Sequence, residues 1–267
     1  MIRRLRLAGP ILAIALCGCA ATVQPPLMGS GDSLDHARRL MERRDYIGAS
    51  EWLTGYVGGH AGSVDVDEAV YLLGECRLLG KEYAMAQVEF ERLLRDYPES
   101  DSNSAGSFKL AEAMQKQSRM EDFDQEFTVR ALEQYQRYLR EYPGHWLNPE
   151  AERRVAQLRT QLAKKLLDTG NLYMKLSYVT AARMYYERVR TDYSDTPVIG
   201  EAEIGLARCD AVLGKRDEAL AALREMEARF KGQPLGNKAA EARHEIEREA
   251  RRHRAPKPVR NVPEPPK

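Results

Sequence analysis

The sequence predicts an all-α fold, a superhelical array (α-solenoid) of about five helical hairpins, because one residue pattern recurs along the chain. In three copies an alanine is followed by an aromatic residue and then by a position that ends the helix: Ala86/Phe90/Pro98, Ala131/Tyr135/Pro143 and Ala182/Tyr186/Ser194. Fainter copies flank them at Ala49/Leu53 and Ala219/Leu223. Small residues let two helices approach closely, the ring fills the gap to the next hairpin, and proline ends a helix. The pattern therefore predicts stacked helix pairs.

A second set of small residues lies twelve positions before four of these alanines, at Ala37, Gly74, Gly170 and Ala207. Each predicted hairpin thus carries a small residue on both of its helices. The alanines of the first two copies are 37 residues apart, close to the period of about 34 residues that is typical of tetratricopeptide repeats. Arrays of this kind present extended surfaces that bind other proteins. The sequence therefore favours a scaffold over an enzyme.

The first two hairpins follow from helix start and stop signals. The first is expected at about 33–62, with Asp45 opening its second helix. The second is expected at 65–98, where Asp65 or Asp67 caps the first helix, Gly80-Lys81 turns the chain and Tyr97-Pro98 ends the second helix. Three hairpins are expected within residues 32–147.

The third hairpin is longer than the others. Ala111 and Ala131 are twenty residues apart rather than twelve, so about eight residues are inserted, and the insert is acidic and contains Phe123 and Phe127. One interpretation is a long loop whose two phenylalanines fold back on the core. The other is a loop that contacts a partner, since long loops in compact arrays are often kept for binding.

The fourth hairpin begins with an unusually long helix. Asn148 is expected to cap it, Pro149 occupies its first turn, and apolar residues recur at helical spacing as far as Tyr173. A helix of that length can pack against two hairpins. Residues 178–191 are expected to form the second helix of the fourth hairpin, and the fifth hairpin is expected at about 197–231. A charged helix at 237–252 is expected to cap the array. Repeats four and five with this cap then occupy residues 148–254.

The N-terminal residues point to a membrane anchor. Residues 1–18 read as a lipoprotein signal peptide, with Arg3, Arg4 and Arg6 before an apolar run too short to cross a bilayer. Leu16-Cys17-Gly18-Cys19 resembles a bacterial lipobox, in which Cys19 becomes the lipidated N-terminus. The covalent N-acyl and diacylglycerol lipid (palmitate) on Cys19 is then the only non-protein group expected, and no cofactor or metal is expected. The alternatives are an ordinary cleaved signal peptide with a chance cysteine, or a permanent transmembrane anchor.

Two terminal segments are expected to lie outside the folded array. Residues 19–31 carry two prolines and no helical period and are interpreted as a tether. Residues 255–267 are basic and proline-rich, which predicts a disordered tail. This tail is either simply solvated or in contact with anionic lipid headgroups or a partner.

Composition excludes several functions. Removal of residues 1–18 leaves 38 Lys and Arg against 40 Asp and Glu, and this near-neutrality predicts no nucleic-acid binding.

Cys76 and Cys209 occupy the same register in two hairpins, which indicates buried packing residues. The five histidines show no metal-ligand spacing, and no phosphate loop or catalytic nucleophile motif occurs. An enzyme, with a small-molecule substrate, is therefore not expected.

The ordered combination of these features resembles the BamD family, lipoproteins of the machinery that assembles β-barrels in the bacterial outer membrane. The resemblance covers about residues 19–230. It rests on the lipobox, the five repeats, the insertion ahead of Arg130-Ala131-Leu132-Glu133, the junction from Tyr142-Pro143 to Asn148-Pro149, the long helix, and the segments Tyr178–Ala182 and Asp192–Thr196. Two departures are Met184, where many members place an arginine, and Ser194, where the family usually has proline.

The resemblance implies binding rather than chemistry. It implies a lipid-anchored protein on the periplasmic face of the outer membrane, with the barrel insertase and unfolded outer-membrane proteins as partners. The first three repeats would then line a groove for an unfolded segment, at Arg38, Met41, Tyr71, Glu75, Leu78 and Phe108. Repeats four and five would dock the insertase through Arg183, Arg188 and Arg190. Ordinary half-buried helix residues and a solvated helix face are the alternatives for the two sets.

A different envelope scaffold is the main competing hypothesis. A secretin pilot or a cell-division protein with tetratricopeptide repeats would account equally well for the second repeat. The insertion and the long helix favour the assembly factor.

Overall fold

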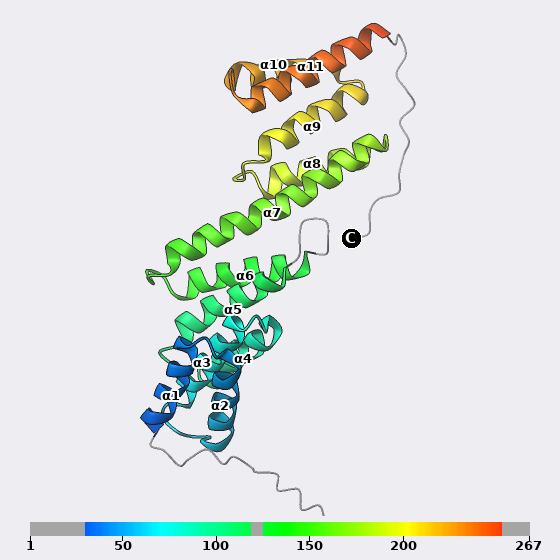
Figure 1. Cartoon of the computed structure of the whole chain (residues 1–267). Coiled ribbons are helices and arrows are strands. Elements are labelled where there is room, and N and C mark those ends of the chain that lie inside the picture. The colour runs from blue at the N-terminus through cyan, green and yellow to red at the C-terminus, as the bar shows by residue number, and fades with distance from the viewer. Residues whose placement is uncertain (1–29, 119–124, 253–267) are drawn as a thin grey trace, which may run out of the picture.

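Eleven α-helices and no strand make up residues 30–118 and 125–252, the ranges that this computed structural model describes (Figure 1). Their bounds are α1 Ser30–Glu42, α2 Tyr46–Gly59, α3 Val66–Leu79, α4 Tyr83–Asp96, α5 Asn103–Gln117, α6 Glu126–Glu141, α7 Asn148–Lys175, α8 Val179–Asp192, α9 Ile199–Val212, α10 Arg216–Arg229 and α11 Pro234–Arg252. The first ten pair as five successive hairpins and α11 packs on the last one. The predicted all-α array of helical hairpins is confirmed.

Four of the five hairpins turn in the same way. The second residue after the first helix adopts a left-handed conformation, at Arg44, Lys81, Ser177 and Gly214. The next N–H then reaches back to a carbonyl five residues earlier, as from Glu82 to Arg77 at 2.8 Å. This is the Schellman ending of a helix, which satisfies carbonyls that the helix leaves unpaired. The predicted turn at Gly80-Lys81 is confirmed, and its left-handed residue is the lysine.

Close helix packing explains the small residues of the repeat. Ala86, Ala131 and Ala182 have no exposed surface, and neither have the weaker copies Ala49 and Leu53. The aromatic residues Phe90, Tyr135 and Tyr186 are at most 2% exposed. A Cβ at Gly74 would lie 2.7 Å from the Phe90 ring, and one at Gly170 would lie 2.6 Å from the Tyr186 ring. Glycine is therefore required where the ring lies against the opposing backbone.

The core is a row of four hydrophobic clusters, each shared between neighbouring hairpins. They lie on α1–α4, α3–α7, α7–α9 and α9–α11. Consecutive clusters share helices, so each hairpin is stabilised by its neighbours, as in other repeat proteins. The long helix α7 contributes Leu158 and Leu162 to one cluster and Leu167 to the next. It therefore joins the two ends of the array, as its length predicts.

Two predicted helix caps are wrong in detail. Asn148 is the first residue of α7 rather than its cap, and its Nδ2 donates back to the carbonyl of Tyr142 at 3.1 Å. Asp65 is the N-cap residue of α3, as predicted, but its side chain makes no capping hydrogen bond and instead accepts one from the Tyr56 hydroxyl at 2.7 Å. Asp45 does cap α2, since it accepts from the Gly48 N–H at 3.0 Å. The misassigned side chains are used for tertiary contacts that a local pattern does not reveal.

Several sequence expectations fall outside the described residues. These are the signal peptide, Cys19, most of the tether, Phe123 and the tail at 255–267. Phe127 is half-buried, with the Arg130 guanidinium 5.5 Å from its ring centroid. The capping helix begins three residues earlier than expected, at Pro234. Within the two described ranges, none of the helices has the length and apolar character needed to cross a bilayer.

Candidate functional site

The first helices of the hairpins form the face that carries most of the candidate residues. Direct contacts join α1 with α3, α3 with α5, α7 with α9, and α9 with α11. Because a curved stack is tightest on its inner side, these contacts assign the first helices to the concave side of the array. A segment bound along that side would meet one helix from each hairpin.

Polar contacts link the first helices of hairpins one to three. Arg38 on α1 pairs with Glu68 on α3 at 2.5 Å, and with Asp35 on its own helix at 2.9 Å. Glu75 on α3 lies 3.9 Å from Lys109 on α5, which also pairs with Glu112 at 3.1 Å. These side chains are partly exposed, so the ion pairs add little stability but fix the charges in place.

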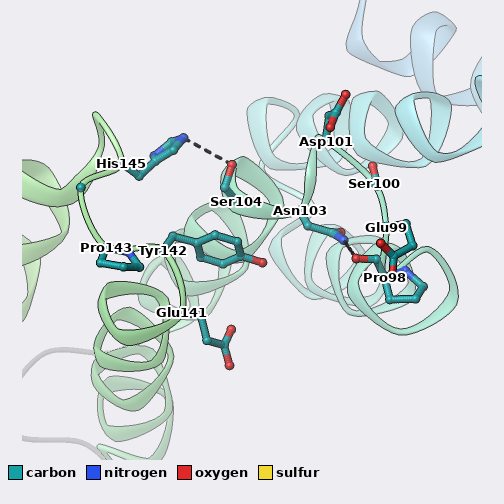
Figure 2. Close-up of a pocket in the computed structure, with 11 residues that line it drawn as sticks. Pro98, Glu99, Ser100, Asp101, Asn103, Ser104, Glu141, Tyr142, Pro143 and His145 are labelled. Atoms are coloured by element: carbon teal, nitrogen blue, oxygen red, sulfur yellow. Dashed lines mark hydrogen bonds between the residues drawn. The ribbon is translucent and has the colours of Figure 1, made fainter.

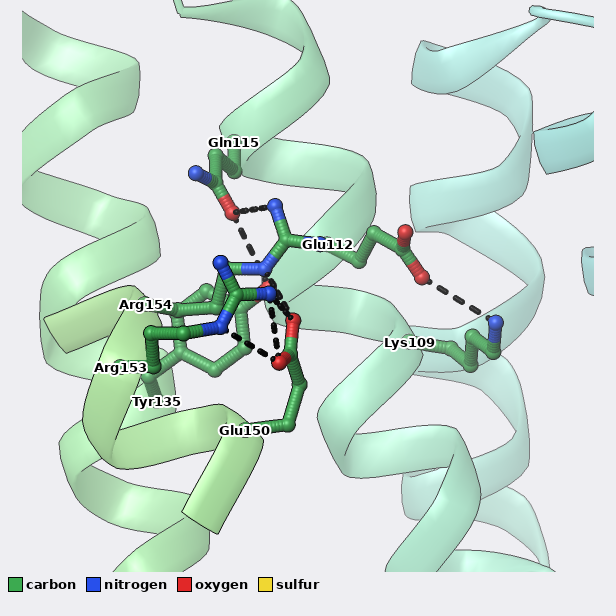
Figure 3. A network of polar contacts seen from close by, with 7 residues as sticks. All are labelled: Lys109, Glu112, Gln115, Tyr135, Glu150, Arg153 and Arg154. Atoms are coloured by element: carbon green, nitrogen blue, oxygen red, sulfur yellow. Dashed lines mark hydrogen bonds and ion pairs between the residues drawn. The ribbon is translucent and has the colours of Figure 1, made fainter. Parts of the chain in front are cut away.

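A denser network links α5 with α7 (Figure 3). Gln115 on α5 accepts from the Tyr135 hydroxyl at 3.1 Å and from Arg154 on α7 at 3.5 Å. Arg154 also pairs with Glu150 at 2.7 Å, and Arg153 pairs with the same carboxylate. Hydrogen bonds from these two arginines lower the pKa of Glu150. Three separate groups result, and we call their members together the polar ladder: Arg38 and Glu68; Glu75, Lys109 and Glu112; and Gln115, Glu150 and Arg154.

Two tyrosines lie beside the polar ladder. Tyr71 is half-buried, and burial followed by the nearby Glu75 carboxylate raises its pKa. Tyr135 is fully buried, and burial likewise raises its pKa. Both hydroxyls therefore stay protonated, and they serve as hydrogen-bond donors rather than as acids or bases.

The structure separates the six predicted groove residues into two groups. Arg38, Met41, Tyr71 and Glu75 are half-buried on α1 and α3, where a partner can reach them. Leu78 and Phe108 are only 8% and 5% exposed and belong to the central cluster. The rings of Tyr135 and Tyr138 lie edge-on to Phe108, with centroids 5.4 and 5.6 Å away. Leu78 and Phe108 therefore pack the hairpins together and do not line an open groove.

The three predicted arginines of repeat four all lie on α8. Arg183 donates to Asp210 on α9 at 3.1 Å, and Arg188 lies 3.9 Å from Asp192. Arg190 pairs with Glu187 on its own helix. Arg188 is the most exposed, with 60% of its side chain accessible. Each of these arginines already has an acidic neighbour, and an acidic partner would have to compete with it.

Sequence reasoning did not identify the α5–α7 part of the polar ladder. Opposite charges at helical spacing were present as Lys109/Glu112 and Glu150/Arg154. That spacing predicts pairs along one helix, but not the contact from Arg154 to Gln115, 39 residues away. Only the stacking of α7 against α5 and α6 reveals it.

The cysteines and histidines show no sign of chemistry in the described residues. Cys76 and Cys209 are buried free thiols, and burial raises the pKa of each to about 12. The prediction that they are packing residues is confirmed. Among the residues that the structure describes, no group of His, Cys, Asp and Glu is arranged to hold a metal ion.

Comparison with known proteins gives a family. A family model named YfiO and described as "Outer membrane lipoprotein" matches residues 34–225. No curated protein matches the sequence. A tetratricopeptide repeat protein from Parabacteroides merdae is 15% identical, with 83% of this chain and 75% of that chain covered and a TM-score of 0.36. The assembly chaperone of RpL4 (Acl4) is 14% identical, with 84% and 100% covered and a TM-score of 0.30.

Proposed function

The chain belongs to the YfiO family of outer membrane lipoproteins, and we propose that it is a lipid-anchored, periplasm-facing scaffold of β-barrel assembly. In this proposal it binds the barrel insertase and unfolded outer-membrane proteins. The observation that carries the proposal is the extent of the family match, which runs from α1 to α10 and includes the whole polar ladder. The proposed function is the binding of other proteins, because the described residues include charged and aromatic side chains that can recognise a polypeptide.

The concave side of α1, α3 and α5 suits an extended polypeptide. Arg38 and Glu75 present opposite charges on neighbouring helices, and Tyr71 adds an aromatic surface with a hydroxyl. An unfolded barrel segment alternates polar and apolar side chains and carries unpaired backbone groups. Half-buried tyrosine and methionine can contact the apolar side chains, while the polar ladder can meet the polar ones.

The exposed face of α8 suits the folded partner. Arg183, Arg188 and Arg190 are partly exposed basic residues of α8, and Met184 next to Arg183 is 43% exposed. Charged groups of this kind guide encounter and fix the register of an interface more than they add affinity. We assign the insertase to this face and the unfolded substrate to the concave side of the first three repeats.

The anchor can be tested with two single cysteine variants. Cys19→Ala is expected to release the protein from the outer-membrane fraction, because acyl chains on Cys19 would be lost. Cys17→Ala is the matched control and is expected to stay in the membrane. If Cys19→Ala remains fully membrane-bound, the lipidation proposal is wrong.

The partner can be tested by co-purification from detergent-solubilised outer membrane. The wild-type protein is expected to recover a β-barrel insertase, and Arg188→Glu is expected to recover less of it. Arg224→Glu, at a side chain 63% exposed on α10, is the control for added negative charge. Recovery of a secretin or of peptidoglycan-linked proteins in place of the insertase would favour the other envelope scaffold.

A further inference from the structure

An open cleft lies between two neighbouring hairpin junctions, and none of the polar-ladder residues lines it (Figure 2). One wall is the α4–α5 turn and the start of α5, and the other is the end of α6 with the α6–α7 turn. Its volume is about 620 Å³. The lining residues are Pro98, Glu99, Ser100, Asp101, Asn103, Ser104, Glu141, Tyr142, Pro143, Gly144 and His145.

Hydrogen bonds hold both walls of the cleft in place. The Asn103 Nδ2 donates to the carbonyls of Tyr97 and Pro98, each at 2.8 Å. His145 joins the two walls, because its Nε2 lies 3.3 Å from the Ser104 hydroxyl and its Nδ1 lies 2.6 Å from the Tyr138 hydroxyl. The cleft is therefore formed before any ligand arrives, which reduces the cost of ordering on binding.

The acidic residues of the cleft have no basic partner. Glu99, Asp101 and Glu141 are exposed and take part in none of the ion pairs among the described residues. Neighbouring Asp96 lies outside the cleft and is paired with Arg95. Three uncompensated carboxylates around one concave surface produce a negative potential that attracts cations.

A buried acceptor in the cleft also lacks a donor. Asn103 is 7% exposed, and although its Nδ2 is used twice, its Oδ1 has no hydrogen-bond partner. A buried polar atom without a partner costs free energy, and it is an unusual feature that calls for a donor. Asn148 Oδ1, after the next proline turn, is unpaired in the same way, so the unpaired oxygen is a feature of this type of turn.

An exposed tryptophan stands at the rim. Trp146 is 77% exposed, and its ring centroid lies 5.7 Å from that of His145, which lines the cleft. Tryptophan is enriched at the energetic centres of protein interfaces and attracts Lys and Arg through its ring face. Pro98, Tyr142 and Pro143 add apolar surface beside it.

We propose that this cleft, with Trp146 at its rim, docks an extended, cationic segment of a partner protein. Arginine or lysine side chains of the segment pair with Glu99, Asp101 and Glu141, and its apolar groups contact Trp146 at the rim. The proline and aromatic lining suits a segment in the polyproline II conformation, which has no internal hydrogen bonds and docks on such surfaces. A single metal ion is a poorer occupant, since no group of acids in the described residues is arranged to hold one.

The basic residues that follow Arg252 have similar chemistry but a poor route to the cleft. The α6–α7 turn lies at one edge of the array, whereas α11 ends at the opposite edge (Figure 1). Retracing the 19 residues of α11 takes about 28 Å. Two further hairpins then separate that edge from the cleft. Fifteen residues, 253–267, can span at most about 54 Å, so little of that length would remain for binding.

The test is a peptide-binding measurement on the purified, full-length lipoprotein in detergent. The probe is a fluorescein-labelled peptide of six Arg-Pro units, compared with six Glu-Pro units. Only the basic peptide is expected to bind. The triple variant Glu99→Gln/Asp101→Asn/Glu141→Gln is expected to weaken binding at least about tenfold, and Trp146→Ala about fivefold.

A matched control separates the cleft from general negative charge. Asp217, Glu218 and Glu225 on α10 are exposed and unpaired within the described residues. Their triple amide variant is expected to bind the basic peptide like the wild type. Equal loss of binding in the two triple variants would overturn the proposal.

Truncation after Arg252 tests the other occupant. The affinity for the basic peptide is expected to stay within about twofold of the full chain. A rise of about tenfold or more would mean that the chain's own tail occupies the cleft, and the partner proposal would then be wrong. The proposal shares with the proposed function only the premise that the chain binds polypeptides. Failure of peptide binding therefore leaves the anchor and insertase experiments unaffected.

Discussion

The three junctions that follow hairpins two, three and four are closed in two different ways. At Tyr97-Pro98 and Tyr142-Pro143 a proline follows the tyrosine, and an asparagine six residues after the tyrosine donates back to its carbonyl. At Tyr193-Ser194 the proline is missing, and Thr196 donates to the tyrosine carbonyl at 2.7 Å. The long helix α7 adds a clamp there.

The clamp is Arg159. It donates to the Asp192 carbonyl at 2.7 Å and to the Asp195 carboxylate at 2.5 and 2.8 Å, and its guanidinium lies 5.2 Å from the Tyr193 ring centroid. Asp195 is thereby engaged within the molecule. In contrast, Glu99, Asp101 and Glu141 at the proline turns have no such partner within residues 30–118 and 125–252. The difference indicates that acids at the serine turn stabilise the fold, whereas acids at the proline turns remain available for recognition.

The largest expected effect lies in the packing beside the serine turn. A Cβ at Gly205 would lie 2.6 Å from the Tyr186 ring, which Gly170 meets from its own hairpin. Because the ring is confined by both helices, Gly205→Ala is expected to cost about 1–3 kcal/mol of unfolding free energy in urea titrations. Gly55→Ala is the control, since nothing lies within 4 Å of its Cβ position in α2, and it is expected to gain up to about 1 kcal/mol. An unchanged midpoint for Gly205→Ala would show that the ring can move aside.

Replacement of the two asparagines at the proline turns should reduce stability by different amounts. Asn103 makes two hydrogen bonds to carbonyls and Asn148 makes one. With each neutral bond contributing about 0.5–1.5 kcal/mol, Asn103→Ala is expected to cost about 1–3 kcal/mol and Asn148→Ala about half of that. Thermal unfolding of both variants checks the order. The reverse order would contradict the view that these side chains close equivalent turns.

Removal of the Arg159 guanidinium should lower the free energy of unfolding by an amount that depends on pH. Hydrogen bonding from Arg159 lowers the pKa of Asp195. A carboxylate with a lowered folded-state pKa stabilises the protein above its unfolded pKa of about 4, and this contribution disappears as the pH falls through the folded-state pKa. The Asp195 side chain is 55% exposed, so Arg159→Ala is expected to cost only about 1 kcal/mol near pH 7.

The measurement is urea unfolding of wild type and Arg159→Ala from pH 3 to 7. The difference in unfolding free energy between the two proteins is expected to become smaller as the pH is lowered. A gap that stays constant would mean that Arg159 acts through packing on Tyr193 rather than through the Asp195 charge.

The smallest expected change in stability comes from Ser194→Pro, which converts the serine turn into a proline turn. The backbone N–H of Ser194 has no backbone acceptor among the described residues, so proline there removes no hydrogen bond. Ser194→Pro is expected to gain at most about 0.4–1 kcal/mol, by restricting the unfolded chain. Tyr193 has ψ 33°, whereas Tyr97 and Tyr142 have ψ 62° and 63°, and this difference offsets part of the gain. Combined with Arg159→Ala, the proline is expected to recover part of the lost stability in the same urea titration.

Much of the fold follows from the sequence because repeat packing is local. Ala86, Phe90 and Gly74 predict a close helix pair within one hairpin, and Tyr97-Pro98 predicts where that hairpin ends. The positions of hairpins two, four and five are accordingly confirmed. Asn148 was misassigned because an asparagine before proline at a helix start has a local cap as its simplest interpretation, whereas here it bonds back across the turn.

The candidate site was less predictable. The family resemblance implies groove residues on the first helices, and Arg38, Met41, Tyr71 and Glu75 do lie half-buried there. Leu78 and Phe108 also lie on first helices, but both are buried in the central cluster, where Tyr135 and Tyr138 of α6 pack against Phe108. Whether an apolar residue near the edge of a helix is exposed depends on the angle between neighbouring hairpins, which the pattern of one helix does not contain.

The sequence by itself determined that helices form, where most of them turn, and which small and aromatic residues bring them together, because these depend on contacts within about one repeat. The tertiary structure alone decided which charges meet across hairpins. Gln115 with Arg154, and Arg159 with Asp195, are joined by the stacking of α7 on its neighbours. It also decided which acids are left unpaired, since a carboxylate is free or engaged according to which distant side chain folding brings beside it.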